Sequence, residues 1–149
     1  MIPKIVHYIW FGGNPYTEKI QKCIDSWHKY LPDYEFKLWN EETFDINSVP
    51  FTKQAYDNKK WAFVSDYVRL YALYNYGGWY LDTDVEIRKS LDSFNEKKLV
   101  LGTDEDGSLT ALMGAERGFE LWGELLQNYE KTTFINEDGS FNQVVNNAY

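Results

Sequence analysis

The stretch WAFVSDYVRLYALYNYGGWYLDTDVEI, residues 61–87, decides the fold class of this chain of 149 residues. Up to Tyr76 it carries apolar or aromatic side chains around nearly the whole circumference of a helix, and Gly77 and Gly78 then end that helix. A strand follows from Trp79 to Ile87. Because a helix that is apolar almost all round belongs in a domain interior, the stretch predicts a buried helix followed by a strand.

One narrow polar stripe interrupts the predicted helix. It consists of Ser65, Asp66 and Arg69, and buried charges of this kind are costly unless they are paired or bound to a ligand. Asp66 and Arg69 lie three residues apart and can satisfy each other as an ion pair. Alternatively, the stripe faces a polar cavity that holds a charged or hydroxyl-rich ligand. The stripe itself leaves both interpretations open.

Two carboxylates interrupt the predicted strand. Asp82 and Asp84 are two residues apart, so the strand places them on one face, where like charges repel. A divalent cation is the usual physical reason to tolerate such a pair, and oxygen ligands favour Mg²⁺, Mn²⁺ or Ca²⁺ over zinc. Asp104 and Asp106 form a second D-x-D pair, which we interpret as part of a hairpin turn over residues 104–108.

The rest of the chain alternates between strand and helix patterns, with residues 41–60 assigned to a loop and a short helix. The predicted strands are Lys4–Phe11, Tyr34–Trp39, Lys98–Leu101 and Leu109–Gly114, and the further predicted helices run from the N-cap Thr17 to Leu31 and from about Arg117 to Lys131. This alternation predicts an α/β fold with a mostly parallel sheet flanked by helices.

Composition narrows the classes of function. With 23 acidic and 15 basic residues the formal net charge is -8, which argues against nucleic-acid partners and electrostatic membrane docking. The single cysteine, Cys23, excludes an intrachain disulfide and a thiolate zinc site. No apolar run approaches the ~20 residues of a membrane span, and no leader precedes Pro3, so we expect no transmembrane segment and a cytoplasmic location. His7 and His28 lack partners at metal spacing and are assigned to packing or the surface.

Several of these motifs together resemble glycosyltransferase family 32, the GT-A enzymes with a DxD sugar-binding region. The resemblance rests on Ser65-Asp66-x-x-Arg69, on Gly77-Gly78-x-Tyr80-Leu81-Asp82-x-Asp84 and on the opening IPKIVHYIWFG, residues 2–12. The family includes bacterial capsule transferases, yeast-type mannosyltransferases and, more distantly, the clostridial glucosylating toxins. The similarity implies a GT-A-like, Rossmann-like fold and a nucleotide-sugar donor.

The resemblance also implies a role for each matching residue on the donor side. Trp10 would stack on the nucleotide base, although a core tryptophan is the alternative. Asp66 and Arg69 would hold donor sugar hydroxyls and the diphosphate, with Ser65 as a supporting polar contact. Tyr80 would line the donor pocket or pack beneath it.

The two carboxylates acquire separate roles from the resemblance. Asp84 would ligate Mn²⁺ or Mg²⁺ directly, and Asp82 would contact the metal through water or bind the ribose and sugar hydroxyls of the donor. The divalent ion would stabilise the negative charge that develops on the leaving diphosphate.

The expected function is metal-assisted, retaining transfer of a hexose from a nucleotide-diphosphate sugar to a saccharide or glycolipid acceptor in surface polysaccharide or capsule synthesis. By analogy, a uridine-linked donor is preferred over GDP-mannose. The alternatives are a non-catalytic nucleotide-sugar or carbohydrate-binding domain and a metal-dependent phosphohydrolase using the same carboxylates.

Family catalytic domains extend further than Tyr149. Residues 1–149 are therefore expected to be the nucleotide-sugar-binding part of a C-terminally truncated GT-A domain, with little transferase activity alone. The missing part would supply another metal ligand, much of the acceptor pocket and any peripheral membrane association.

Overall fold

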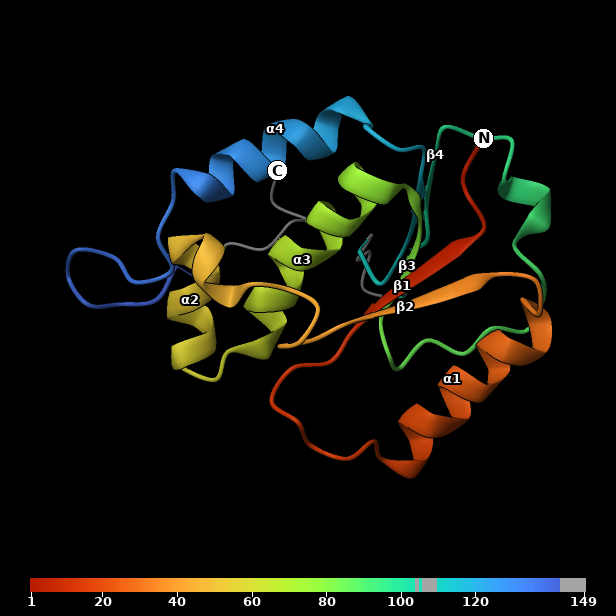
Figure 1. Ribbon diagram of the computed structural model, residues 1–149, viewed down its shortest axis with the longest axis horizontal. Helices are drawn as coiled ribbons and strands as arrows, with labels where there is room; N and C mark the ends of the chain where they lie inside the picture. Colours follow the sequence, from red (N-terminus) through yellow and green to blue (C-terminus); the bar gives the residue numbers. More distant parts are fainter. Residues whose placement is uncertain (104, 106–109, 143–149) are drawn as a thin grey trace.

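The computed structural model describes residues 1–103, 105 and 110–142, and in this range a five-stranded sheet is flanked by helices (Figure 1). The strands are β1 (Ile5–Ile9), β2 (Glu35–Trp39), β3 (Gly78–Leu81), β4 (Leu99–Leu101) and β5 (Leu112–Ala115). The α-helices are α1 (Glu18–Tyr30), α2 (Pro50–Asp57), α3 (Trp61–Tyr76) and α4 (Glu120–Glu130), and short 3₁₀ turns occupy Ile46–Ser48 and Asp92–Phe94.

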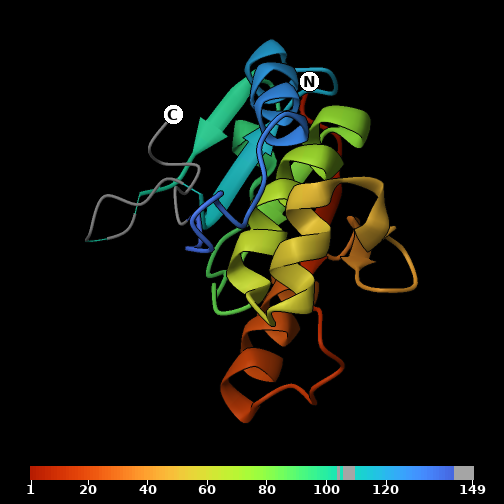
Figure 2. The same ribbon diagram turned by 90° about the vertical axis from the view of Figure 1, so that its left-hand side faces the viewer.

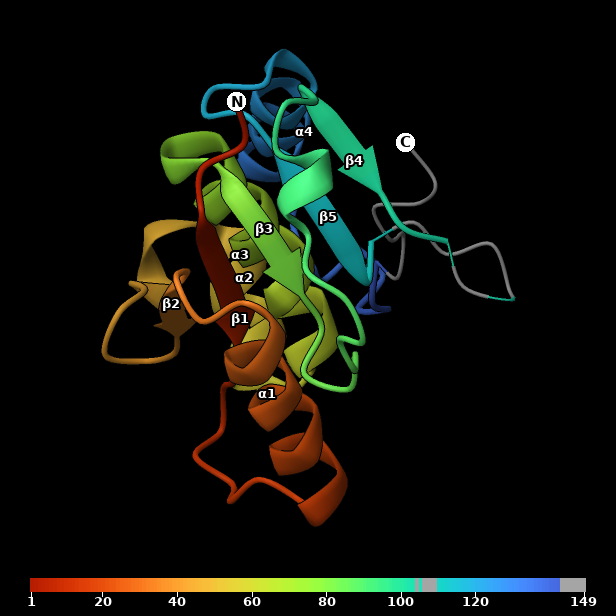
Figure 3. The ribbon, with the colours of Figure 1, turned by 90° about the vertical axis from the view of Figure 1, so that its right-hand side faces the viewer.

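The sheet has the strand order β2-β1-β3-β5-β4, which Figure 3 shows nearly face-on. β1 pairs in parallel with both β2 and β3, whereas β5 pairs antiparallel with both β3 and β4. Among the described strands, therefore, β5 alone runs against the other four. This confirms the predicted α/β fold with a mostly parallel sheet and flanking helices.

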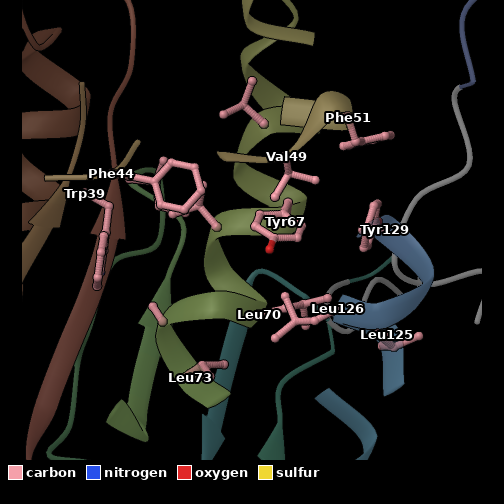
Figure 4. Close-up of a cluster of buried hydrophobic side chains, with 14 of the residues drawn as sticks. Trp39, Phe44, Val49, Phe51, Tyr67, Leu70, Leu73, Leu125, Leu126 and Tyr129 are labelled. Carbon is pink, nitrogen blue, oxygen red and sulfur yellow. The ribbon is translucent and has the colours of Figure 1, made fainter. Parts of the chain in front are cut away.

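The helices cover opposite faces of the sheet, with α1 on one side and α2, α3 and α4 on the other (Figures 1 and 2). Successive residues of β3 serve the two sides in turn: Trp79 and Leu81 pack in the α1 cluster, and Tyr80 packs in the α3 cluster. The α3 cluster is rich in aromatic residues, including Tyr67 and Tyr129 (Figure 4). Aromatic side chains thus make up a large part of the core.

Local signals in the sequence predict the helices well. Thr17 is the N-cap of α1, since its hydroxyl accepts from the Ile20 N–H at 3.2 Å. The interior helix has the predicted bounds, Trp61–Tyr76, and the undecided segment before it contains α2 and one 3₁₀ turn. α4 lies within its predicted range.

The turn between α3 and β3 requires glycine at both positions. Gly77 has φ 68° and donates its N–H to the Leu73 carbonyl, and a Cβ at this position would lie 2.6 Å from the Arg117 nitrogen. Gly78 has φ 108°, and a Cβ there would lie 2.7 Å from the Ile5 carbonyl oxygen. The pair therefore ends the helix and lets β3 start directly against β1.

The predicted strand from Trp79 to Ile87 is wrong beyond Leu81. β3 ends at Leu81, and residues 82–87 form a turn and an irregular segment, which we call the DXD loop. The Val85 N–H donates to the Asp82 carbonyl at 3.0 Å, closing a turn around Thr83 and Asp84. Asp82 and Asp84 consequently lie on a loop at the strand end, not on one face of a strand.

The region of the predicted hairpin is covered only in part. Residues 104 and 106–108 of the predicted turn lie outside the described residues. On either side of it, β4 lies within the predicted range Lys98–Leu101, and β5 overlaps only the second half of the predicted range Leu109–Gly114, of which Leu109 lies outside the described residues. The two strands pair antiparallel.

His7 lies fully buried in β1 beneath the end of α3. Its Nε2–H donates to the Gly77 carbonyl at 2.8 Å, and its Nδ1 accepts from the Trp39 indole N–H at 3.1 Å. Burial lowers the pKa of His7 to about 4, with a bond to Gly77 opposing the shift and nearby Lys37 adding to it. His7 is thus a core residue, as predicted, and joins three elements.

Candidate functional site

A cleft of about 370 Å³ opens where the carboxyl ends of β1 and β3 meet the first half of α3. Ligands of α/β sheets bind outside the carboxyl ends of the strands. The lining residues are Ile9, Trp10, Phe11, Asn14, Ile20, Trp61, Ala62, Ser65, Arg69, Tyr80, Asp82, Thr83 and Asp84. A larger hollow of about 500 Å³ beside β2 lacks such a charge cluster, because Glu35 and Lys37 are the charged residues in its lining.

The cleft brings together all but one of the residues that the sequence singled out. Trp10, Ser65, Arg69, Tyr80, Asp82 and Asp84 line it. Asp66 does not line it: its side chain is buried behind the wall, with Oδ1 3.5 Å from the Arg69 Nη2. Both interpretations of the polar stripe therefore hold in part, since an internal ion pair exists and the stripe also borders a cavity.

Arg69 is held rigidly by backbone and side-chain acceptors. Its Nη2 donates to the Ser65 hydroxyl at 2.7 Å, its Nε to the Ser65 carbonyl at 3.2 Å, and its Nη1 to the Thr110 carbonyl at 2.7 Å. The guanidinium thereby links α3 to the segment that precedes β5. Its orientation at the cleft wall is set before any ligand arrives.

The charge of Arg69 is balanced by its neighbours. Its Nη2 lies 3.4 Å from the Asp82 Oδ1, and its central carbon lies 4.5 Å from the centre of the Tyr80 ring. Burial acts to lower the pKa of Arg69, but Tyr80, Asp82 and Asp66 raise it overall. Arg69 is thus a permanent cation at the cleft wall.

Tyr80 and Asp82 form a short hydrogen bond in which the Tyr80 hydroxyl donates to the Asp82 Oδ1 at 2.6 Å. Burial raises the pKa of Tyr80, so the phenol stays protonated and remains a donor. Burial also raises the pKa of Asp82, against the opposing effects of Arg69 and of the Tyr80 bond. One oxygen of Asp82 is therefore already engaged by the protein.

Asp84 differs from Asp82 in its surroundings. Its side chain is exposed in the turn of the DXD loop and makes no hydrogen bond or ion pair with the described residues. Among the described residues, none engages either of its oxygens, which leaves both for a ligand in the cleft.

The oxygen atoms of Asp82 and Asp84 could supply part of the ligand shell of a hard divalent cation. Within residues 1–103, 105 and 110–142, no group of three or more His, Cys, Asp or Glu residues could hold a metal. Mg²⁺, however, is commonly held by one or two carboxylates while water and substrate phosphates complete its shell. Asp84, with the second oxygen of Asp82, suits that kind of site.

Aromatic side chains form another part of the cleft lining, which we call the aromatic wall: Trp10, Phe11 and Trp61. The Trp10 indole N–H donates to the Asn14 carbonyl at 2.6 Å, and its ring packs edge-on against Tyr16. Trp61 lies against Gly12, where a Cβ would be 3.0 Å from the Trp61 ring. Sequence reasoning missed Trp61, although its position four residues before Ser65 places it on the same helix face.

Residues 17–101 match the family described as "Glycosyltransferase sugar-binding region containing DXD motif". The match covers more than half of the chain and includes α3, β3 and the DXD loop. The chain belongs to this family. The resemblance to glycosyltransferase family 32 is thereby confirmed.

Curated relatives of this chain are longer proteins. "Inositol phosphoceramide mannosyltransferase 3" of Schizosaccharomyces pombe is 34% identical over 142 residues, covering 89% of this chain and 38% of the relative. "Mannosyl phosphorylinositol ceramide synthase SUR1" of Saccharomyces cerevisiae is 30% identical over 119 residues, covering 71% of this chain and 30% of the relative. The matched part of the chain thus spans 38% of the first relative and 30% of the second.

Among solved structures, the chain is similar to "PaToxG Glycosyltransferase", with a TM-score of 0.67 at 20% sequence identity. The superposition covers 85% of this chain and 58% of that one. This likeness supports the GT-A-like fold. In the described residues, no helix has the length and apolar character needed to cross a membrane.

Proposed function

We propose that the chain binds a nucleotide-diphosphate hexose and serves metal-assisted transfer of that hexose to a saccharide or glycolipid acceptor. The observation that carries the proposal is the cleft at the carboxyl ends of β1 and β3, where a fixed guanidinium, two carboxylates and an aromatic wall meet. A nucleotide sugar presents matching chemistry: a flat base, a diphosphate and sugar hydroxyls.

The residues divide the work according to their surroundings. Trp10 on the aromatic wall suits stacking against the base. Arg69, held by Ser65 and Thr110, suits the diphosphate, because its planar guanidinium can bind two oxygens at once. It also places a positive charge at the cleft of a protein whose net charge is -8. When bound, Mn²⁺ or Mg²⁺ would act as a Lewis acid toward the leaving diphosphate.

The two carboxylates suit different contacts. Asp84, with both oxygens available, suits direct metal ligation, whereas Asp82, with Oδ1 engaged by Tyr80, suits a water-mediated contact or a ribose or sugar hydroxyl. Asp66 supports Arg69 from behind, and its contact with donor sugar hydroxyls stays a prediction.

The names of the relatives suggest which hexose is transferred and to which kind of acceptor. Their names, inositol phosphoceramide mannosyltransferase and mannosyl phosphorylinositol ceramide synthase, favour mannose as the hexose and a glycolipid as the acceptor. A uridine-linked donor, a capsule context, retention of configuration and a cytoplasmic location stay predictions from the sequence. The test therefore includes both nucleotide series.

Thermal unfolding of the chain with UDP-glucose, UDP-galactose, UDP-N-acetylglucosamine or GDP-mannose, each with and without Mn²⁺, tests the proposal. We expect stabilisation that needs both one of these donors and the metal. Asp84→Asn should abolish the metal-dependent part, whereas Glu86→Gln, an equal charge change two residues away, should retain it.

Stabilisation that persists unchanged in Asp84→Asn would contradict the metal role. Stabilisation by no donor under any condition would contradict nucleotide-sugar binding. Release of free sugar or phosphate without acceptor dependence would support the phosphohydrolase alternative instead.

A further inference from the structure

Two side chains of helix α1 form hydrogen bonds with the backbone of the DXD loop. The indole N–H of Trp27 donates to the Val85 carbonyl at 2.7 Å, and the Ser26 hydroxyl accepts from the Ile87 N–H at 2.9 Å. Trp27 is fully buried. Neither Ser26 nor Trp27 lines the cleft, so neither can touch a ligand in it.

These bonds restrain the loop on one side of Asp84. On the other side, the Asp82 N–H donates to the Ala111 carbonyl at 2.9 Å. Asp84 lies between these attachments and contributes no hydrogen bond or ion pair of its own to the described residues. Its carboxylate position is therefore set by the backbone restraints on each side of it.

The same helix also contributes to the cleft wall. Ile20, in the first turn of α1, lines the cleft, and the segment that leads into α1 carries Trp10 of the aromatic wall and Asn14, which also lines the cleft. α1 thus connects the cleft lining at Ile20 to the DXD loop and helps to set the spacing between them. A change in how α1 holds the loop would alter that spacing.

We propose that Ser26 and Trp27 are positioning residues that hold Asp84 in the geometry for a divalent cation. This inference rests on the proposed function and adds to it two residues outside the cleft. Metal sites depend on the groups that orient their ligands, and loss of such groups typically weakens metal binding by about 10- to 100-fold.

Two substitutions remove the hydrogen bonds while keeping most of the packing: Ser26→Ala and Trp27→Phe. We expect each to weaken Mn²⁺ binding about tenfold, as measured by the free-Mn²⁺ electron paramagnetic resonance signal in the presence of a nucleoside diphosphate. Ser26→Thr keeps the hydroxyl and should retain the wild-type affinity.

Matched controls separate positioning from general destabilisation. Trp79→Phe removes the N–H of another fully buried tryptophan, which donates to Asn95 at 2.9 Å, and Ser48→Ala removes a serine bond to the Asp45 carbonyl. Trp79→Phe should lower the free energy of unfolding about as much as Trp27→Phe does, and Ser48→Ala about as much as Ser26→Ala does. Both controls should leave the Mn²⁺ affinity unchanged.

A second readout needs no metal. Hydrogen exchange of the amides of residues 83–87 in the metal-free chain should be faster in Ser26→Ala and Trp27→Phe than in the controls. Unchanged exchange in these variants, or Mn²⁺ affinity equal to that of the wild type, would overturn the inference.

The two proposals fail differently. If the wild-type chain binds Mn²⁺ and a nucleoside diphosphate but the two variants bind equally well, the positioning role is wrong and the proposed function stands. If the wild-type chain binds no Mn²⁺, the proposed metal role and this inference are both wrong. This holds even if the amides of residues 83–87 exchange more slowly in the wild type than in the two variants.

Discussion

At the scale of single residues, Arg69 carries a buried positive charge whose partners come from three parts of the chain. α3 supplies Ser65 and Asp66, the strand end supplies Asp82, and the segment before β5 supplies the Thr110 carbonyl. The fork of the guanidinium reaches all of them, which a point charge on a single nitrogen cannot do.

Arg69→Lys should therefore be costly even though the charge is kept. We expect a loss of about 2 to 4 kcal/mol in the free energy of unfolding, because the Thr110 carbonyl and the carboxylates lose donors in a buried setting. Urea denaturation measures it. Arg88→Lys, at a side chain 83% exposed, should stay within about 0.5 kcal/mol of the wild type.

A value for Arg69→Lys as small as that of Arg88→Lys would show that the guanidinium network contributes nothing to stability. Arg69→Lys should also lose the thermal stabilisation that a nucleotide sugar gives to the wild type. That second readout bears on the binding role of Arg69 separately from its structural role.

A site residue can be predicted from the sequence when its residue type is unusual for the helix or strand that contains it. A polar stripe in an apolar helix and a carboxylate pair after a glycine stop are visible without a structure, so Arg69, Asp82 and Asp84 were found. Thr110 was not found, because it contributes a backbone carbonyl, which every residue has. Asp66 was found, but its place behind Arg69 depends on helix rotation against the sheet.

At the scale of elements, the junction of α3 and β3 is tightly constrained at Gly77. Gly77 and Gly118 have similar positive φ values, 68° and 75°. A Cβ at Gly77 would meet the Arg117 backbone at 2.6 Å, whereas a Cβ at Gly118 would meet nothing within 4 Å.

These two glycines make a matched pair of alanine substitutions. Gly118→Ala should cost about 1 to 2 kcal/mol for the left-handed backbone alone. Gly77→Ala should cost clearly more, because the α3–β3 turn or the Arg117 backbone must also shift. Denaturant midpoints with equal m-values give the comparison, and equal costs would contradict the close approach.

Element bounds were predictable where the signal was local. The N-cap Thr17 and the glycine stop place helix ends to within a residue. The end of β3 was misjudged, because apolar residues continue through Val85 and Ile87, and these pack against α1 rather than extend the ladder. That distinction depends on Trp27 and Ser26, which lie far away in the sequence.

At the scale of the whole molecule, acid stability should depend on His7. The unfolded chain takes up a proton at this histidine near its ordinary pKa of 6.5, whereas the folded chain does so only near pH 4. The unfolded state therefore binds more protons between these values, and stability falls as the pH drops through this window.

From this difference we expect His7 alone to remove about 2 kcal/mol of stability between pH 7 and pH 5. His7→Gln should flatten the pH dependence in that range, whatever its cost at pH 7. Unfolding free energies from urea titrations at both pH values decide it, and an unchanged slope in His7→Gln would contradict the assignment.

The pairing of β1 with β3 has a consequence for synthesis on the ribosome. The His7 side chain and the Gly77 carbonyl it binds are 70 residues apart, and β1 lies between β2 and β3 in the sheet. At the usual elongation rate of about 5 to 20 residues per second, β1 waits roughly 4 to 14 s for that partner. During this interval a nascent chain displays the apolar run of residues 5–11, which makes it a natural client for ribosome-associated chaperones.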